Sequence, residues 1–372
     1  MSKRLLAKLK QPDKVLLSLL GVLIVGGFFI FLSASLGLLA DGKVSFASIA
    51  FNQFFLGIVL GLVAAFIMSR IHYRVWRKYT PYILGLSVIF TLLVFLPGVG
   101  MSWGGASRWV HFGPVTFQPV EFLKIGVVLF AAHFLAQHGR QLQSHSHFGI
   151  VALISMIGLV AVPLLLQPDT GSLVVIVAAI SAMFFTAGLK WRDVGIIIVI
   201  GLVALAVLAA ARPYVFDRLT TFMNPGEDAQ GSGYQIKQSL IAVGSGGIMG
   251  RGFGQSVQKF NYLPEPIGDS IFAVYAEEFG FVGSTLLLAV FLALLLRMYY
   301  IAIKAPDAFG ALLVVGIATL IIVQSLFNIA AMLGVVPLSG LPLIFVSHGG
   351  TALASTLAGL GIVLNVSRYR KP

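Results

Sequence analysis

The chain has 372 residues, of which 58% are hydrophobic and only 10% are charged, and its mean hydropathy is +0.97. These values exclude a soluble globular domain and indicate a polytopic helical membrane protein. The absence of cysteine excludes disulfides, thiolate metal sites and a cysteine nucleophile, and the net charge of +12 is better explained by membrane topology than by nucleic-acid binding.

Ten apolar runs are long enough to cross a bilayer, for which about 20 residues suffice. The first run follows a basic N-terminus, as a signal peptide would, but it is long for one, and we interpret it as a membrane span. The predicted spans cover about residues 15–35, 46–68, 82–96, 119–136, 148–166, 171–188, 194–211, 271–296, 309–333 and 341–366. We therefore expect an all-α membrane protein with ten transmembrane helices.

The basic residues indicate the orientation of these spans. Ten spans place both termini on one side, and most of the 25 Lys and Arg residues fall in the termini and loops of that side. The positive-inside rule makes this side cytoplasmic. The large polar loop between the seventh and eighth helices is then extracytoplasmic. We expect a single domain over residues 1–372, with its chemistry in this loop at about 212–270, because so long a connection without structure is usually functional.

Two ionisable residues, Glu121 and Lys124, fall within the fourth span. They are three residues apart and therefore share one helix face. They could be a self-neutralising pair that only packs helices, but ionisable groups in a membrane usually face an interior or a watery cavity. We expect the pair to line a substrate cavity. Weaker polar signals, typical of hydrogen bonds between helices, come from Asn52, Gln53, Gln324 and Asn328.

Short motifs occur in a fixed order along nearly the whole chain. They are Gly105-Ala-Ser-Arg-Trp109, Phe117-Gln-Pro-Val-Glu-Phe-Leu-Lys124, Gln167-Pro-Asp-Thr-Gly171, Gly231-Ser-Gly-Tyr-Gln235, Ser256-Val-Gln-Lys-Phe-Asn-Tyr-Leu-Pro-Glu265, Ala276-Glu-Glu-Phe-Gly280 and Ser347-His-Gly-Gly350. Each motif is weak alone, but the ordered set resembles the FtsW/RodA/SpoVE family, also called SEDS. The stretch from Ser256 to Glu265 is more similar to the FtsW and SpoVE branch than to RodA.

The resemblance implies a peptidoglycan glycosyltransferase that polymerises glycan strands from lipid II in cell division or cell-shape maintenance. The growing glycan would pass from its lipid pyrophosphate to a sugar hydroxyl of an acceptor lipid II. The implied location is the bacterial cytoplasmic membrane, with both termini cytoplasmic. The implied partners are lipid II, the nascent glycan strand, membrane lipids and a class B penicillin-binding protein, with no nucleic acid. The one cofactor considered is a divalent cation, Mg²⁺ or Mn²⁺.

The leaving pyrophosphate requires cations, which Arg and Lys supply through charge-assisted hydrogen bonds. Six candidates lie on or open toward the outer side: Arg108, Lys124, Arg212, Arg218, Arg251 and Lys259. The motifs add five further substrate-binding candidates: Glu121, Asp169, Glu265, Ser347 and His348. The glycine-rich run from Gly244 to Gly254 either lets the backbone approach substrate closely or is only a flexible loop.

Glycosyl transfer also requires a base that accepts the proton of the acceptor hydroxyl. The catalytic Asp of the family follows the Tyr-Leu-Pro-Glu motif by four residues, and Asp269 occupies that position here. Judged from the residues alone, Asp269 is equally suited to cap the eighth helix, since Asp is a favoured N-cap.

The sequence departs from the family pattern around this residue. The family has His-Thr before the Asp and Phe after it, where this chain has Ile267, Gly268 and Ser270. His348 and Ile344 likewise replace a usual Tyr and Pro. These changes leave open the pKa of Asp269 and its acceptor contact, but not the reaction class. Two other readings remain: a lipid II flippase or transporter, and a noncatalytic scaffold for a transpeptidase.

Overall fold

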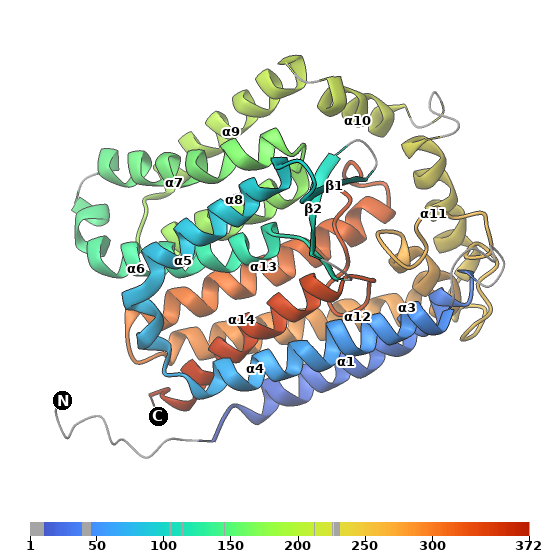
Figure 1. Ribbon diagram of the computed structural model, residues 1–372, viewed down its shortest axis with the longest axis horizontal. Helices are drawn as coiled ribbons and strands as arrows, with labels where there is room; N and C mark the ends of the chain where they lie inside the picture. The colour runs from blue at the N-terminus through green and yellow to red at the C-terminus, as the bar shows by residue number, and fades with distance from the viewer. Residues whose placement is uncertain are drawn as a thin grey trace.

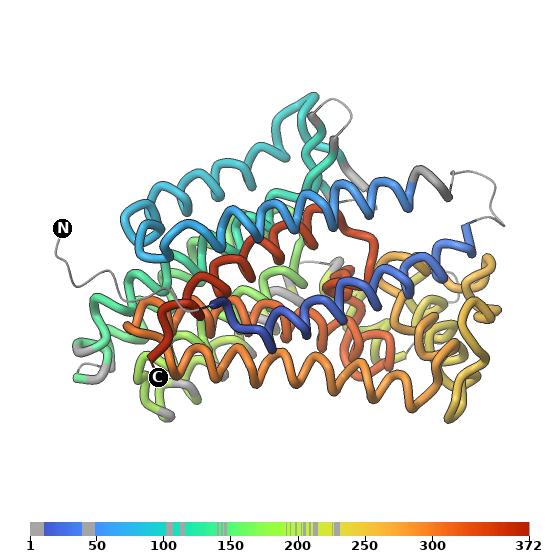
Figure 2. The backbone as a smooth tube through the Cα atoms, turned by 90° about the horizontal axis from the view of Figure 1, so that it is seen from below, coloured from blue at the N-terminus to red at the C-terminus, as the bar shows by residue number. Residues whose placement is uncertain are grey.

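The computed structural model describes residues 11–38, 46–103, 106–112, 115–144, 146–211, 213–224, 226 and 231–371 (Figure 1). Long helices run side by side, and α1 begins where α14 ends, at one end of the bundle (Figures 1 and 2). The two helices of the long polar loop, α10 and α11, lie toward the opposite end (Figure 1). This arrangement agrees with an even number of crossings.

Eight of the described helical stretches are long and apolar enough to cross a membrane. They are α1 (Lys14–Ser35), the continuous helix of α3 (Phe46–Asn52), π-helical η2 (Gln53–Val59) and α4 (Leu60–Arg70), α5 (Tyr73–Leu92), α6 (Val120–Ser144), α7 (Ser146–Leu166), α12 (Ile271–Ile303), α13 (Ala308–Met332) and α14 (Gly350–Arg368). The shorter α8 (Thr170–Thr186) and the 21-residue α9 (Trp191–Ala211) occupy the two remaining predicted spans. The predicted all-α membrane fold is confirmed.

The helices are buried to different degrees. Most residues of α13 and α14 are buried, whereas α1, α4 and α5 expose many large apolar side chains. In a membrane protein such exposed apolar surface faces lipid. The interior of the bundle is therefore built around α13, which packs against α6, α8 and α12.

Two connections contain more structure than the sequence suggests. The long polar loop, expected to lack structure, contains α10 (Pro213–Met223) and α11 (Ser232–Gly246). The third span ends in the short 3₁₀ turn η3 (Leu93–Phe95), and the loop after it forms an antiparallel sheet. The sheet strands are β1 (Gly100–Trp103), β2 (Ala106–Phe112) and β3 (Val115–Phe117), in that order, and Val110 pairs with both Gly100 and Phe117. The short sheet adds to the helical bundle without changing its class.

The glycine-rich run after α11 packs against a break in α12. Gly280 has a φ of 64°, which interrupts the helix, and a Cβ at Gly250 would lie 2.2 Å from the carbonyl oxygen of Glu278. The N–H groups of Arg251 and Gly252 donate to the carbonyls of Glu277 and Glu278 at 3.0 and 2.9 Å. Glycine is needed here because two backbones meet without room for side chains. The sequence suggested that glycines in this run let the backbone come close to substrate. At Gly250 the backbone comes close to α12 instead.

The tenth span begins later than predicted. The prediction placed its start near Leu341, but α14 begins at Gly350, and the preceding stretch, residues 341–349, is not helical. Most of this 341–349 segment is nevertheless buried, with Leu343 and Val346 almost fully covered, although His348 is exposed. Its apolar composition resembles that of a span, yet contacts with neighbouring helices hold it as an irregular loop.

Candidate functional site

The short turn that contains Asp269, residues 265–270, is fixed through its backbone. The carbonyl oxygens of Ile267, Gly268 and Asp269 each accept a hydrogen bond, from His348 N–H, Ser347 Oγ and Asn328 Nδ2 respectively, all at 2.8 Å. On the other side, Gln235 Nε2 of α11 donates to Ser270 Oγ at 2.9 Å. The Asp269 turn is therefore held between α11, α13 and the 341–349 segment.

The 341–349 segment is itself held by amide side chains. Asn328 Nδ2 also donates to the carbonyl of Leu341 at 2.7 Å, and Gln324 Nε2 donates to that of Pro342 at 3.1 Å. Gln53 is both a donor and an acceptor: its Nε2 donates to Ser347 O at 3.1 Å, and its Oε1 accepts from Gly349 N–H at 3.2 Å. Gln53, Gln324 and Asn328 thus bind irregular backbone, and Gln324 also joins two helices as predicted by accepting from Lys124 of α6, whereas Asn52 is exposed.

Asp269 does not cap the eighth helix. Ser270 is the N-cap residue of α12, and no side-chain hydrogen bond caps this helix end. Burial, and after it the negative charge of Glu265, raise the pKa of the Asp269 carboxyl to about 6 against the opposing effect of Arg218 and Arg108. A carboxylate with such a proton affinity suits a general base near neutral pH. The capping alternative is therefore wrong, and a catalytic role remains a prediction.

Arg108 lies beside Asp269. A Cβ built on Gly340 would lie 3.6 Å from Asp269 Oδ2 and 3.7 Å from an Arg108 Nη1, so both charged groups border the same point. Strand β2 carries Arg108, whose guanidinium also donates to the carbonyls of Gln167, at 3.4 Å, and Pro168. The small sheet, which lies between the third and fourth spans, thus brings Arg108 close to Asp269, which lies between the seventh and eighth spans.

The other predicted substrate-binding residues are placed differently. Arg218, in α10, is close enough to Asp269 to lower its pKa, and Glu265 belongs to the same turn. Asp169 caps α8 by accepting from Ser172 N–H at 3.2 Å. Ser347 and His348 hold the Asp269 turn as described above, and the His348 ring stacks on Phe31 of α1 with 5.9 Å between the centroids. Arg212 lies outside the described residues.

Two predicted cations form internal ion pairs. Lys259 Nζ is buried and contacts Glu278 Oε1 at 2.8 Å, Ser33 Oγ at 3.2 Å and Gly254 O at 2.9 Å. Arg251 Nε lies 3.5 Å from Glu277 Oε1, and Glu277 Oε2 also accepts from Ser256 Oγ at 2.5 Å. The two glutamates of the Ala276-Glu-Glu motif therefore neutralise these cations and hold the loop on α12.

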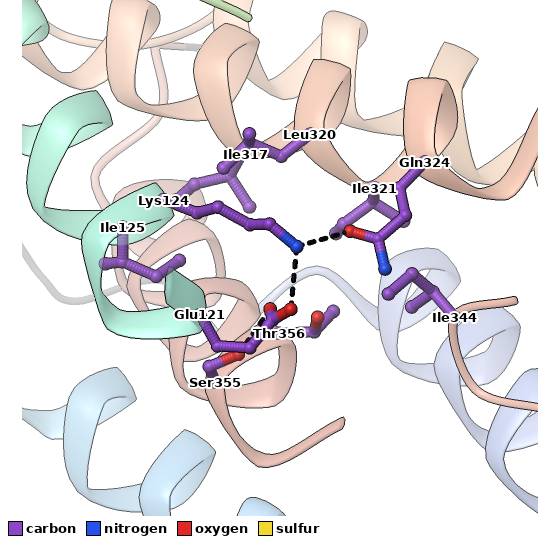
Figure 3. Close-up of a pocket in the computed structure, with 10 residues that line it drawn as sticks. All are labelled: Glu121, Lys124, Ile125, Ile317, Leu320, Ile321, Gln324, Ile344, Ser355 and Thr356. Carbon is purple, nitrogen blue, oxygen red and sulfur yellow. Dashed lines mark hydrogen bonds and ion pairs between the residues drawn. The ribbon is translucent and has the colours of Figure 1, made fainter. Parts of the chain in front are cut away.

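The membrane-depth pair is closely engaged (Figure 3). Lys124 Nζ lies 2.7 Å from Glu121 Oε1 and donates to Gln324 Oε1 at 2.8 Å, while Ser355 Oγ of α14 lies 3.4 Å from Glu121 Oε2. The adjoining cavity has a volume of about 20 Å³, room for one water molecule. A cavity of this size cannot admit a sugar. Through Gln324 the pair is instead connected to the 341–349 segment.

The sequence reasoning missed several residues of this arrangement. Gln235 is the last residue of the Gly231-Ser-Gly-Tyr-Gln235 motif, and it was assigned no role from the sequence. In the structure its side chain donates to Ser270. Gly340 has a φ of 70° and leaves the space that Asp269 and Arg108 border. Its place in the Ser339-Gly340-Leu341-Pro342 run was a turn signal, but the predicted tenth span began within this run, at Leu341, and Gly340 was given no role.

Comparison with known proteins gives consistent similarities. The FtsW/RodA/SpoVE family model, described as a cell cycle protein, matches residues 13–372. The chain is 37% identical to stage V sporulation protein E of Bacillus subtilis (strain 168) over 364 residues, which cover 98% of this chain and 99% of that protein. It is 35% identical over 344 residues to the probable peptidoglycan glycosyltransferase FtsW of Coxiella burnetii, with 92% of each chain covered.

Solved structures are similar as well. A chain from work on the structural coordination of polymerization and crosslinking by a peptidoglycan synthase complex superposes with a TM-score of 0.76 and 28% identity, covering 96% of this chain and 98% of that one. The rod shape determining protein RodA of Thermus thermophilus gives a TM-score of 0.70 with 28% identity, covering 99% of both chains.

The Glu121 and Lys124 pair should be more sensitive to loss of one partner than of both. We expect Glu121→Gln or Lys124→Met alone to destabilise the protein by roughly 3–5 kcal/mol, because each leaves a buried charge unpaired. The double variant should be more stable than either single one. Thermal unfolding of the purified proteins in detergent, with wild type alongside, measures this. Equal stability of all three variants would contradict the buried ion pair.

Proposed function

Because the chain belongs to the FtsW/RodA/SpoVE family, we propose that it elongates peptidoglycan glycan strands from lipid II at Asp269. The chain is a peptidoglycan glycosyltransferase with a multi-pass membrane fold. The single observation that supports Asp269 as its reaction centre is a carboxylate of raised proton affinity, within the influence of two arginines, where the polar loop enters α12. Lipid II keeps its prenyl tail in the bilayer and its sugars just outside, so its reacting bond lies at this depth.

In the proposed step, Asp269 acts as the general base. An acceptor sugar hydroxyl is barely acidic, and a carboxylate within about 3 Å takes its proton as the oxygen attacks the anomeric carbon of the growing strand. The bond from that carbon to the lipid pyrophosphate breaks, and the pyrophosphate leaves with the bonding electrons. The raised pKa favours this role because a carboxylate with the usual pKa would hold the proton too weakly.

The leaving pyrophosphate gains charge as the bond breaks. Arg108 and Arg218, both close enough to influence the Asp269 carboxyl, are the cations we assign to it. Their attraction strengthens as charge develops, so they stabilise the transition state more than the bound substrate. The N-terminus of α12 directly follows Asp269 and adds backbone N–H groups that favour an anion.

A resident metal is not part of this proposal. Among the described residues no group of three His, Asp or Glu side chains converges in a way that could hold a metal ion. In the proposed reaction every step is assigned to side chains and backbone groups of this chain. A requirement for Mg²⁺ or Mn²⁺ stays a prediction, tested by glycan synthesis with and without a chelator.

The partner and the orientation also belong to this proposal. The similar chain of solved structure comes from a complex that couples polymerization and crosslinking, which supports a class B penicillin-binding protein as partner of this chain. Co-purification of such a transpeptidase with the detergent-solubilised chain tests the assignment.

The excess of basic residues at the end where α1 begins and α14 ends supports cytoplasmic termini.

Asp269→Asn should abolish most polymerisation while leaving the fold intact. Asparagine keeps the size of the side chain but cannot accept the proton, and loss of a general base typically costs roughly 10²–10⁴-fold in rate. Glycan formation from lipid II by purified protein in detergent measures the loss, and it needs no second compartment, unlike a flippase assay. Asp217→Asn, which changes an exposed carboxylate in α10, is the matched control. Near-normal synthesis by the Asp269 variant would defeat the assignment of Asp269 as the base, and Glu265 would become the next candidate.

The pH profile of the reaction should report the Asp269 carboxyl. We expect kcat/KM to rise with pH through an apparent pKa of about 6, because the base works only when deprotonated and kcat/KM reflects the free enzyme. Glu265→Gln should shift the midpoint to lower pH, since the negative charge of Glu265 raises the pKa of Asp269. An unchanged midpoint in that variant, with Asp217→Asn as control, would argue against Asp269 as the titrating group.

The orientation can be tested with single cysteines in this cysteine-free chain. Met249→Cys, at a side chain that is 78% exposed near α11, should react with a membrane-impermeant thiol reagent added outside intact cells. Lys371→Cys, beyond the end of α14, should react only after the membrane is opened. The reverse labelling pattern would place the Asp269 end of the molecule in the cytoplasm and contradict the proposed reaction.

A further inference from the structure

An apolar groove separates α1 from α4 at the end of the bundle opposite Asp269. In two views α1 and α4 run alongside each other (Figures 1 and 2), and α14 forms the floor between them. Leu17 and Gly21 line the groove from α1, Leu62 and Phe66 from α4, and Leu360 from α14. The groove has a volume of about 380 Å³, and its walls are almost entirely apolar. Because it opens between two lipid-facing helices, its occupant comes from the membrane.

The shape of the groove selects the kind of occupant. Its lining on the α1 side extends from Pro12, just before the helix begins, to Ile24, which is roughly 18 Å at the helical rise, close to the depth of one leaflet. The volume is about 930 Å³ when the open mouth is included, so the mean cross-section is roughly 20 to 50 Å². A helix of 10–12 Å diameter would need roughly 80 to 110 Å². The groove can therefore enclose a hydrocarbon chain but cannot enclose a partner helix.

One end of the groove carries a positive charge. Arg368, in the last turn of α14, lines it, and the buried Nε of Arg368 has no hydrogen-bond partner among the described residues. The nearby carboxylates are bound elsewhere. Asp13 caps α1 and pairs with Arg297, at 2.6 Å, and with Arg370. Asp307 pairs with Arg74 at 2.8 Å. An anionic group is what this end of the groove lacks.

We propose that the groove between α1 and α4 binds one acyl chain of an anionic phospholipid whose phosphate is held by Arg368. A guanidinium recognises phosphate through charge-assisted hydrogen bonds. The hydrocarbon chain then covers Leu17, Leu62 and Phe66, whose side chains would otherwise face a gap. Such a lipid belongs to the leaflet on the side of the termini, away from the reaction centre. Binding to the folded state alone raises thermal stability by mass action.

The test titrates detergent-purified protein with dioleoyl phosphatidylglycerol or dioleoyl phosphatidylcholine and counts bound lipid by native mass spectrometry. Wild type should bind the anionic lipid about fivefold more tightly, and Arg368→Gln should remove that preference. Gly21→Phe should weaken binding of both lipids about tenfold, because its ring fills the groove. A Cβ at Gly21 meets nothing within 4 Å, so the ring enters open space.

Gly26→Phe is the matched control, since its Cβ also meets nothing within 4 Å on the same helix but lies outside the groove lining. It should bind lipid within about twofold of wild type. If Gly21→Phe fails to fold, Gly21→Leu replaces it with a smaller filling side chain. Unchanged binding by the Gly21 variant overturns the site, and equal binding of both lipids by wild type overturns the phosphate contact. Loss of a co-purifying single-span partner with unchanged lipid binding would assign the groove to a helix instead.

Discussion

The Asp269 end of the molecule depends on how one stretch of irregular backbone satisfies its hydrogen bonds inside the bundle. Most of the 341–349 segment is buried away from water, so side chains supply donors and acceptors to its backbone. Gln53, Gln324 and Asn328 do so from the second and ninth spans. Because Asn328 and Ser347 also bind the Asp269 turn, the position of the candidate base is set from the interior of the bundle rather than by the loop that carries it.

Charge pairing divides the ionisable residues into two groups. Lys124 with Glu121 and Lys259 with Glu278 are buried pairs, and their charges neutralise each other where an unpaired charge would be costly. Asp269 differs, because burial and Glu265 raise its pKa to about 6 in spite of two nearby arginines. Desolvation therefore outweighs the attraction of the cations. Asp269 can therefore take up a proton near neutral pH, although Arg108 and Arg218 nearby favour its charged form.

The two ends of the bundle are specialised, and α1 extends between them. Near its start, Gly21 borders the apolar groove that ends at Arg368. Near its end, Ser33 contacts both members of the Lys259 and Glu278 pair, which holds the polar loop on α12. Toward one end, α1 is separated from α4 by open space. Toward the other, buried polar contacts fix it. A lipid in the groove would complete the packing of α1 where protein side chains do not.

The sequence by itself determined the family, the helical membrane class and nearly all span positions, because hydropathy is a local property that about 20 successive residues express. It also singled out Asp269, Arg108 and Glu265, which the structure brings together, although their roles remain predictions. Only the tertiary structure decided that the tenth span starts at Gly350, and that Lys259 is neutralised internally. These features depend on contacts between residues far apart in the chain, as with Gln53 and Ser347, and no local pattern encodes such a pairing.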